Sequence, residues 1–140
     1  MHKYAMFWIK EEFCYQYYYK SDVLHRFLNQ CLTNRSIVLD TQFNYVTQPI
    51  SFTQLLKHIK NFHLHIKIDQ DGNTMTLKKH GQSLCIHIEE RYLMIDCNTV
   101  QEADNLLFQP LISFHRNFFI IEKGTINNGW IAPAKKEMIL

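Results

Sequence analysis

The sequence predicts an α+β protein in which an antiparallel or mixed β-sheet is covered by about four helices. Four short segments between residues 63 and 97 alternate apolar and polar residues and are joined by tight-turn sequences, a pattern typical of an antiparallel meander. Segments with apolar residues three and four positions apart, as in amphipathic helices, occur on both sides of this region.

Length and composition limit the class of protein. The chain has 140 residues, so we expect residues 1–140 to form a single domain. Hydrophobic residues make up 46% and charged residues 20%, proportions typical of a folded protein rather than a disordered one. The formal net charge is +2, and acidic and basic residues are interspersed along the chain, which argues against a direct nucleic-acid partner.

The apolar segments and the cysteines point to a compartment. No apolar run approaches the roughly 18 residues needed to span a membrane, and the first residues lack the pattern of a signal peptide. We therefore expect a cytoplasmic protein with its four cysteines as free thiols.

A strand is predicted over residues 3–9, followed by an aromatic segment over residues 10–20. Glu11 and Glu12 at the start of this segment favour a helix, although a strand would place Phe13 on one face with three of the tyrosines. A helix would spread the aromatic side chains around its circumference and leave some of them exposed. Exposed tyrosines are typical of protein–protein surfaces, while half-buried tyrosines without a partner are the more common arrangement.

The next segment combines helices with one short strand. Apolar spacing predicts a helix over residues 22–32 and another over residues 52–62, the latter starting after Ser51. Between them, residues 43–47 alternate as a strand does, and the Gln48-Pro49 pair ends it because proline cannot donate to a sheet ladder.

The meander and the C-terminal part follow. We expect strands over residues 63–68, 73–79, 84–88 and 92–97, with the Asp71-Gly72 turn between the first two and Leu64, Ile66 and Ile68 facing inward. Thr99 and Glu102 match a capping box that starts a helix, which Pro110 either kinks or divides. A buried strand over residues 117–122, a loop over 124–129 and a tail over 130–140 complete the chain.

Side chains with catalytic or metal-binding chemistry are present, but their arrangement does not indicate a catalytic or metal site. His63 with His65 and Cys85 with His87 form two pairs on strand faces, but a third strand would separate them by roughly 9–10 Å. Cys97 precedes a capped helix, which can lower a thiol pKa, yet no signature of a base and an orienting group accompanies it. We expect no metal, no cofactor and no enzymatic activity.

Three stretches of the sequence resemble the sporulation inhibitor of replication (SirA) family of endospore-forming bacteria, in the order in which that family has them. They are Tyr4-x-x-x-Trp8-Ile9-Lys10-Glu11-Glu12-Phe13-x-x-x-Tyr17, then Tyr45-Val46-Thr47-Gln48-Pro49-Ile50, and finally Gly129-Trp130-Ile131-x-Pro133-x-Lys135. Each stretch alone has little specificity, but their order and positions together are specific.

The resemblance implies a non-catalytic inhibitor of replication initiation during sporulation, which binds the N-terminal domain of the initiator DnaA. It also implies that Phe13, Tyr17 and Gln48 lie at the initiator-binding surface, and we include the neighbouring Tyr18 and Pro49 among the candidate partner-binding residues. We expect a monomer that binds one initiator domain. The alternatives are a protein that binds origin DNA directly and a small hydrolase dependent on a cysteine or a metal.

Overall fold

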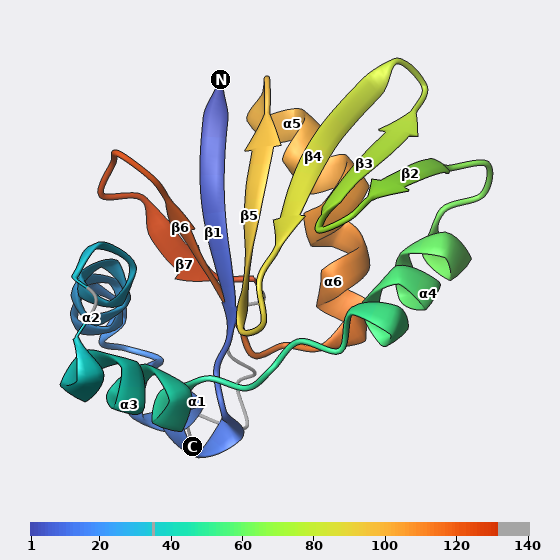
Figure 1. Ribbon diagram of the computed structural model, residues 1–140. Coiled ribbons are helices and arrows are strands. Elements are labelled where there is room, and N and C mark those ends of the chain that lie inside the picture. Colours follow the sequence, from blue (N-terminus) through green and yellow to red (C-terminus); the bar gives the residue numbers. More distant parts are fainter. Residues whose placement is uncertain (35, 132–140) are drawn as a thin grey trace.

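The computed structural model describes residues 1–34 and 36–131. Within them, seven strands form one sheet in the order β2-β3-β4-β5-β1-β6-β7, and every pair of neighbours is antiparallel (Figure 1). The strands are β1 (His2–Trp8), β2 (Lys67–Asp71), β3 (Thr74–Lys79), β4 (Gln82–Ile88), β5 (Tyr92–Cys97), β6 (Phe118–Glu122) and β7 (Asn128–Trp130).

Helices lie on both faces of the sheet, which confirms the α+β class predicted from the sequence. They are α1 (Glu11–Tyr17), α2 (Ser21–Thr33), α3 (Ile37–Val46), α4 (Phe52–Phe62), α5 (Val100–Ala103), the π-helix η1 (Asp104–Phe108) and α6 (Gln109–Phe114). In the part of the chain that the structure describes, none of these helices combines the length and the apolarity needed to cross a membrane.

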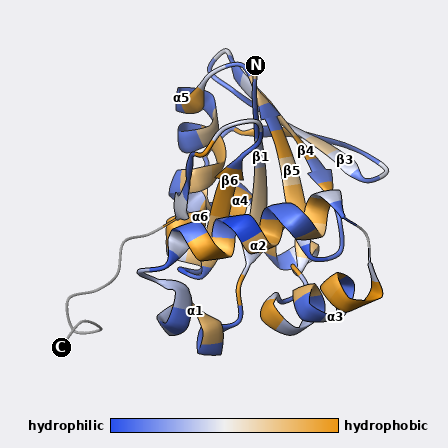
Figure 2. Cartoon of the chain, turned by 90° about the vertical axis from the view of Figure 1, so that its left-hand side faces the viewer, coloured by the Kyte–Doolittle hydropathy of each residue, from blue (hydrophilic) through white to orange (hydrophobic). Residues whose placement is uncertain are grey.

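The central strand β1 contributes to two separate hydrophobic cores. Tyr4 and Met6 point to one face, where α4 and the segment α5-η1-α6 pack. Ala5 and Phe7 point to the other face, where α1, α2 and α3 lie against β1 and β6 (Figures 1 and 2). Because successive side chains of a strand alternate between faces, one buried strand can support both helical layers.

The meander from β2 to β5 is confirmed, including the tight turn at Gly72, whose φ of 59° suits glycine. The start of its first strand was predicted wrongly. β2 begins at Lys67, Leu64 is 73% exposed instead of facing inward, and His65 has a left-handed φ of 65°. Two residues before this turn, His63 is held against the C-terminal helical segment by a contact to Leu106.

His63 compensates for a hydrogen bond that Pro110 cannot make. In an α-helix the carbonyl of Leu106 would accept from the N–H of residue 110, which proline lacks. The helix passes through the π-helical segment η1 at this point, and Nε2 of His63 lies 3.0 Å from the oxygen of Leu106. Nζ of Lys79 lies 3.2 Å from Nδ1 of the same ring, so His63 is neutral, donating through Nε2 and accepting through Nδ1.

The strand predicted over residues 43–47 is wrong, because residues 43–46 belong to α3 and Thr47 is its C-cap. The hydroxyl of Ser36 accepts a hydrogen bond from the N–H of Leu39 and caps this helix. Phe43 and Val46 face inward at helical spacing, and the ring of Phe43 packs edge-on against Phe7 at 5.9 Å. A short alternating segment is compatible with the period of a strand and with that of a helix, and packing on the sheet selects the helix.

At the C-terminal end, the capping box of Thr99 and Glu102 is confirmed, and Pro110 lies at the start of a second helix. The loop predicted over residues 124–129 was too long, because Asn128–Trp130 form the additional strand β7 on β6. The family-like positions Pro133 and Lys135 lie outside the described residues.

Replacing His63 by alanine should lower the free energy of unfolding by about 1–3 kcal/mol, because it leaves the buried carbonyl of Leu106 without a donor. Urea unfolding measures this change. Asn61→Ala, at an exposed position of the same helix, is the control and should change stability by less than about 0.5 kcal/mol. Equal effects of the two substitutions would show that the contact to Leu106 contributes nothing.

Stability should also decrease in mild acid. Burial lowers the pKa of His63 below its ordinary value of 6.5, with the nearby charge of Lys79 acting in the same direction. The unfolded chain therefore binds this proton more readily than the folded one, so stability is fully present above pH 6.5 and decreases as the pH falls below it.

Urea unfolding as a function of pH measures this effect. In His63→Gln the amide can still donate a hydrogen bond but does not titrate, so stability should depend less on pH. A residual dependence of stability on pH should remain, because burial also lowers the pKa of His115. An unchanged slope in His63→Gln would contradict the assignment to His63.

Candidate functional site

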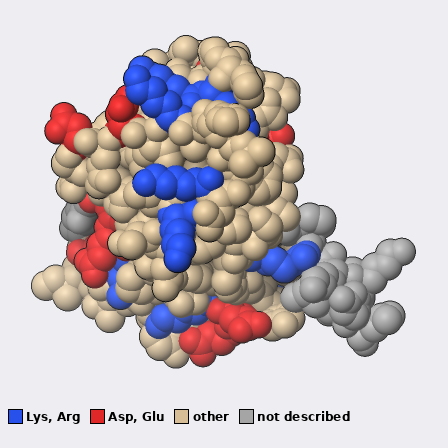
Figure 3. All heavy atoms as spheres, turned by 90° about the vertical axis from the view of Figure 1, so that its right-hand side faces the viewer, with Lys and Arg blue, Asp and Glu red and all other residues tan. Residues whose placement is uncertain are grey.

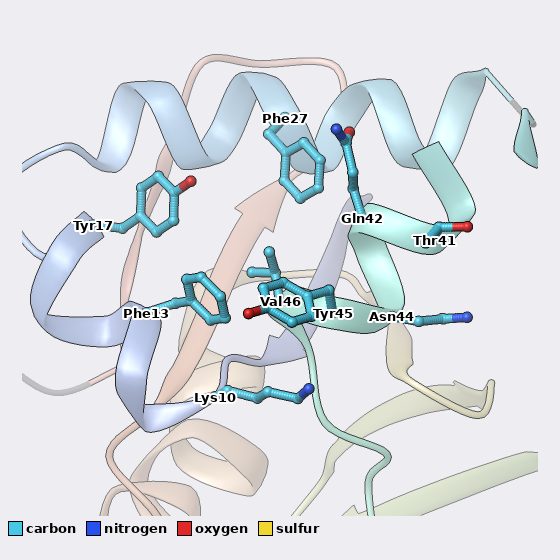
Figure 4. Close-up of a pocket in the computed structure, with 9 residues that line it drawn as sticks. All are labelled: Lys10, Phe13, Tyr17, Phe27, Thr41, Gln42, Asn44, Tyr45 and Val46. Carbon is cyan, nitrogen blue, oxygen red and sulfur yellow. The ribbon is translucent and has the colours of Figure 1, made fainter. Parts of the chain in front are cut away.

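A groove of about 620 Å³ lies between α1, α2 and α3 and is the candidate site (Figure 4). We call it the aromatic groove, and it is lined by Lys10, Phe13, Tyr17, Phe27, Thr41, Gln42, Asn44, Tyr45 and Val46. Phe13 and Tyr17 come from successive turns of α1, Phe27 comes from α2, and the last five come from α3. The wall is therefore built from segments that are far apart in the sequence.

Backbone hydrogen bonds fix the position of α1 next to α3. The N–H of Lys10 donates to the carbonyl of Val46 at 2.9 Å, and the N–H of Gln48 donates to the carbonyl of Trp8 at 2.7 Å. Ile9 and Thr47 form an isolated antiparallel bridge between the same two segments. These contacts connect the end of β1 to the end of α3, so the start of α1 and the end of α3 are held at one point.

The C-terminal end of α3 is stabilised from two sides. The hydroxyl of Thr47, which is fully buried, donates to the carbonyl of Phe43 at 2.7 Å. The guanidinium of Arg91 donates to the carbonyl of Thr47 at 2.8 Å and to that of Asn44 at 3.3 Å. A cation at the C-terminal end of a helix suits the helix dipole. The arrangement holds Tyr45 at the rim of the groove.

Inside the groove, aromatic contacts join α1 to α3. The ring of Phe13 meets Tyr45 edge-on with 5.2 Å between centroids, and Nζ of Lys10 lies 5.3 Å from the centroid of Tyr45. Such edge-on and cation–π contacts add about 0.5–1.5 kcal/mol and about 0.5–1 kcal/mol, respectively. Tyr45 nevertheless remains 62% exposed, so its ring is held in place while one side stays available to a partner.

The groove combines an apolar floor with a polar edge. Phe27 and Val46 supply apolar surface, while Thr41, Gln42 and Asn44 supply hydroxyl and amide groups. Figure 2 looks onto this side of the molecule and shows hydrophobic as well as hydrophilic residues on α1 and α3. An aromatic centre with a hydrogen-bonding rim is the composition typical of protein–protein interfaces.

The structure brings together only some of the residues proposed from the sequence. Phe13 and Tyr17 both line the groove. Tyr18 does not, because its ring stacks on Trp130 with 5.4 Å between centroids and an interplanar angle of 6°. Gln48 is half-buried and Pro49 exposed in the connection from α3 to α4, and neither lines the groove.

Tyr45 was not among the residues proposed from the sequence, nor were Lys10 and Phe27. Reading residues 43–47 as a strand hid Tyr45, because only a helix places it next to Gln42 on one surface. The signal that reveals it is the capping serine at position 36 followed by apolar residues at helical spacing. Phe27 lies in the helix predicted over residues 22–32 and is only half-buried.

The cysteines do not form a reactive centre. Burial raises the pKa of the Cys14 thiol to about 12 and that of Cys31 to about 11. Burial, together with Glu102, raises the pKa of the Cys97 thiol, so the effect that a helix start could have on this thiol does not prevail. Cys85 is half-buried, and its sulfur lies 3.9 Å from Nε2 of His87.

The structure does not join the two pairs considered from the sequence, His63 with His65 and Cys85 with His87, into one metal site. His63 is not part of a strand and bonds to Leu106, while Nε2 of His87 lies 3.0 Å from a carboxylate oxygen of Asp96. Among residues 1–34 and 36–131, no three histidine, cysteine or acidic side chains are placed to hold a metal ion.

Thiol labelling should distinguish these environments. Because the thiolate is the reactive form, Cys85 should react with iodoacetamide much faster than Cys14 or Cys31 in the folded protein. Mass spectrometry of labelled peptides, with and without urea, measures the rates. Cys85→Ser should remove the fast reaction; rapid labelling of Cys14 in the absence of urea would contradict its burial.

Comparison with known proteins identifies the family of the chain. The comparison with curated proteins finds no match. A family model described as sporulation inhibitor of replication protein SirA matches residues 2–135, which includes all three stretches in which the sequence resembles that family. The chain therefore belongs to the SirA family of sporulation inhibitors of replication.

Proposed function

We propose that this protein inhibits replication by binding the N-terminal domain of the initiator DnaA through the aromatic groove, without catalysis. Membership of the SirA family supports replication inhibition during sporulation. The observation that carries the choice of surface is the meeting of Phe13 and Tyr17 with Tyr45 in one partly exposed groove. Two of these residues are positions that the resemblance assigns to initiator binding.

The mechanism is steric. A side chain or helix edge of the initiator domain fills the groove and buries the rings of Phe13 and Tyr17, while Gln42 and Asn44 at the rim satisfy polar groups of the partner. The surface of the initiator that is covered in this way is then unavailable for its own assembly or for other regulators. One protein molecule occupies one initiator domain.

The rigidity of the groove favours such binding. Lys10 and Val46 are joined by a backbone hydrogen bond, and the rings of Phe13 and Tyr45 are already in contact. Little side-chain freedom remains to be lost on binding, and a pre-ordered surface loses less entropy than a mobile one. More of the free energy gained by burying the aromatic area should therefore appear as affinity.

Gln48 contributes differently from the groove residues. Its backbone N–H bonds to Trp8 and thereby holds the two segments that carry α1 and α3. In this proposal its side chain contacts the partner at the edge of the interface, beside Pro49. The ring of Tyr18, which directly follows α1, stacks on Trp130 and so holds the end of this helix in place.

Phe13→Ala and Tyr17→Ala should each weaken binding to the isolated N-terminal domain of DnaA by at least about 2 kcal/mol, which is roughly thirtyfold. Both side chains are only half-buried, so the fold should remain intact. Titration calorimetry measures the affinity, and circular dichroism checks the fold.

Tyr15→Ala and Tyr19→Ala are matched controls, because these tyrosines are 58% and 71% exposed on the same segment and do not line the groove. They should bind almost as the unmodified protein does. The absence of any complex at tens of micromolar, or equal losses in all four variants, would refute the proposed surface.

A further inference from the structure

Two large apolar side chains are exposed in the first turn of α3, outside the aromatic groove. Ile37 is 86% exposed and Val38 is 67% exposed, although isoleucine and valine are among the residue types most often buried. The start of this helix is well defined, because the side chain of Ser36 caps it. Figure 2 looks onto this side and shows hydrophobic residues on α3. The described part of the chain therefore leaves apolar area uncovered here.

These side chains lie on the same face of α3 as residues that line the groove. Seven residues turn an α-helix to within about 20° of its starting direction, so Val38 lies in line with Tyr45, two turns away. Thr41 lies near that line between them, and Ile37 and Gln42 flank it on either side. All five residues are exposed. We call this surface the outer face of α3, and it is continuous with the aromatic groove.

The composition of α3 is unusual for a helix with an exposed face. The side opposite the outer face is apolar, because Phe43 and Val46 pack on the sheet. Surface helices typically place charged and polar residues on the face away from the core, and Figure 3 shows such charges on the right-hand side of the molecule in Figure 1. In α3 the single charged residue is Asp40, which points between the two faces. The outer face is therefore uncharged and partly apolar.

The aromatic groove alone is smaller than a stable interface. Nine residues line it, whereas a specific protein–protein interface uses roughly 20–30 residues and about 800 Å² on each partner. A partner seated on the groove therefore covers neighbouring surface as well. The exposed residues of α1 include the charged Glu11 and Glu12, whereas the outer face of α3 has no charge. Because charged residues are depleted at the centre of interfaces, α3 is the favoured direction.

We infer that the outer face of α3 is the second half of the docking surface, and that an α-helix of the partner lies along it with one end at the aromatic groove. The identity of the partner rests on the proposed function, so this helix belongs to the N-terminal domain of DnaA. Val38, Thr41 and Tyr45 recur at the spacing by which packed helices meet. The partner helix presents an apolar stripe at the same spacing and buries Ile37 and Val38.

Val38→Glu separates binding from folding. Glutamate is a better helix former than valine and suits the positive end of the helix dipole, so the melting temperature should stay unchanged or rise. Binding to the isolated N-terminal domain of DnaA should nevertheless weaken at least about thirtyfold, because a charge is buried against an apolar stripe. Val38→Ala removes only apolar area and should weaken binding about fivefold. Titration calorimetry measures both affinities.

Val100→Glu is the matched control for Val38→Glu. Val100 is 51% exposed in the first turn of α5, which is also capped by the side chain of the residue before it, and it lies outside the outer face and the groove. Ile126→Glu is the control for Ile37→Glu, because both isoleucines are 86% exposed. Both controls should bind as the unmodified protein does, while Ile37→Glu should weaken binding about tenfold. Equal affinities of Val38→Glu and Val100→Glu would overturn the inference.

NMR spectra of the isotope-labelled N-terminal domain of DnaA identify the occupant. Signals that differ between its complexes with the unmodified protein and with Val38→Ala should come from residues three or four positions apart on one helix. Differences confined to loops would overturn the helical occupant.

Comparison with Phe13→Ala keeps the failure of the outer face apart from that of the groove. Weaker binding of Phe13→Ala with normal binding of Val38→Glu would overturn the role of the outer face and leave the groove in place. The reverse result would support the outer face and refute the groove. The absence of any complex with the unmodified protein would overturn both.

Discussion

The architecture depends on one strand that is buried on both faces. β1 pairs with β5 on one side and β6 on the other, and Ala5, Met6 and Phe7 are fully buried. It therefore joins the four-stranded meander to the C-terminal hairpin and supplies apolar side chains to two cores at once. A polar residue at such a position would lose its hydration without regaining partners, whichever face it occupied.

The same strand determines where the aromatic groove forms. Where β1 ends, Trp8 and Lys10 exchange backbone hydrogen bonds with the segment that ends α3. α1 and α3 consequently diverge from one point, and their aromatic side chains, led by Phe13 and Tyr45, meet above it. The aromatic groove is thus a direct consequence of sheet geometry, which explains how a small helix of seven residues can hold a ring in a fixed position at the surface.

The opposite end of the sheet has a different physical character. Around β2 the second face of the sheet has no helix over it, and its side chains are polar and charged, including the apposed Lys67 and Lys78. The end of the sheet next to the aromatic groove is, in contrast, apolar on both faces.

The sequence by itself determined the elements with strong local codes: the meander with its turn at Gly72 and the capping box at Thr99. Tertiary structure decided what local codes leave ambiguous. Four of the five alternating residues 43–47 became part of α3 because Phe43 packs on the sheet, and this brought Tyr45 to the groove. The groove itself arises only when three helices that are separate along the chain pack side by side, since such proximity depends on distances in space and not on spacing along the chain.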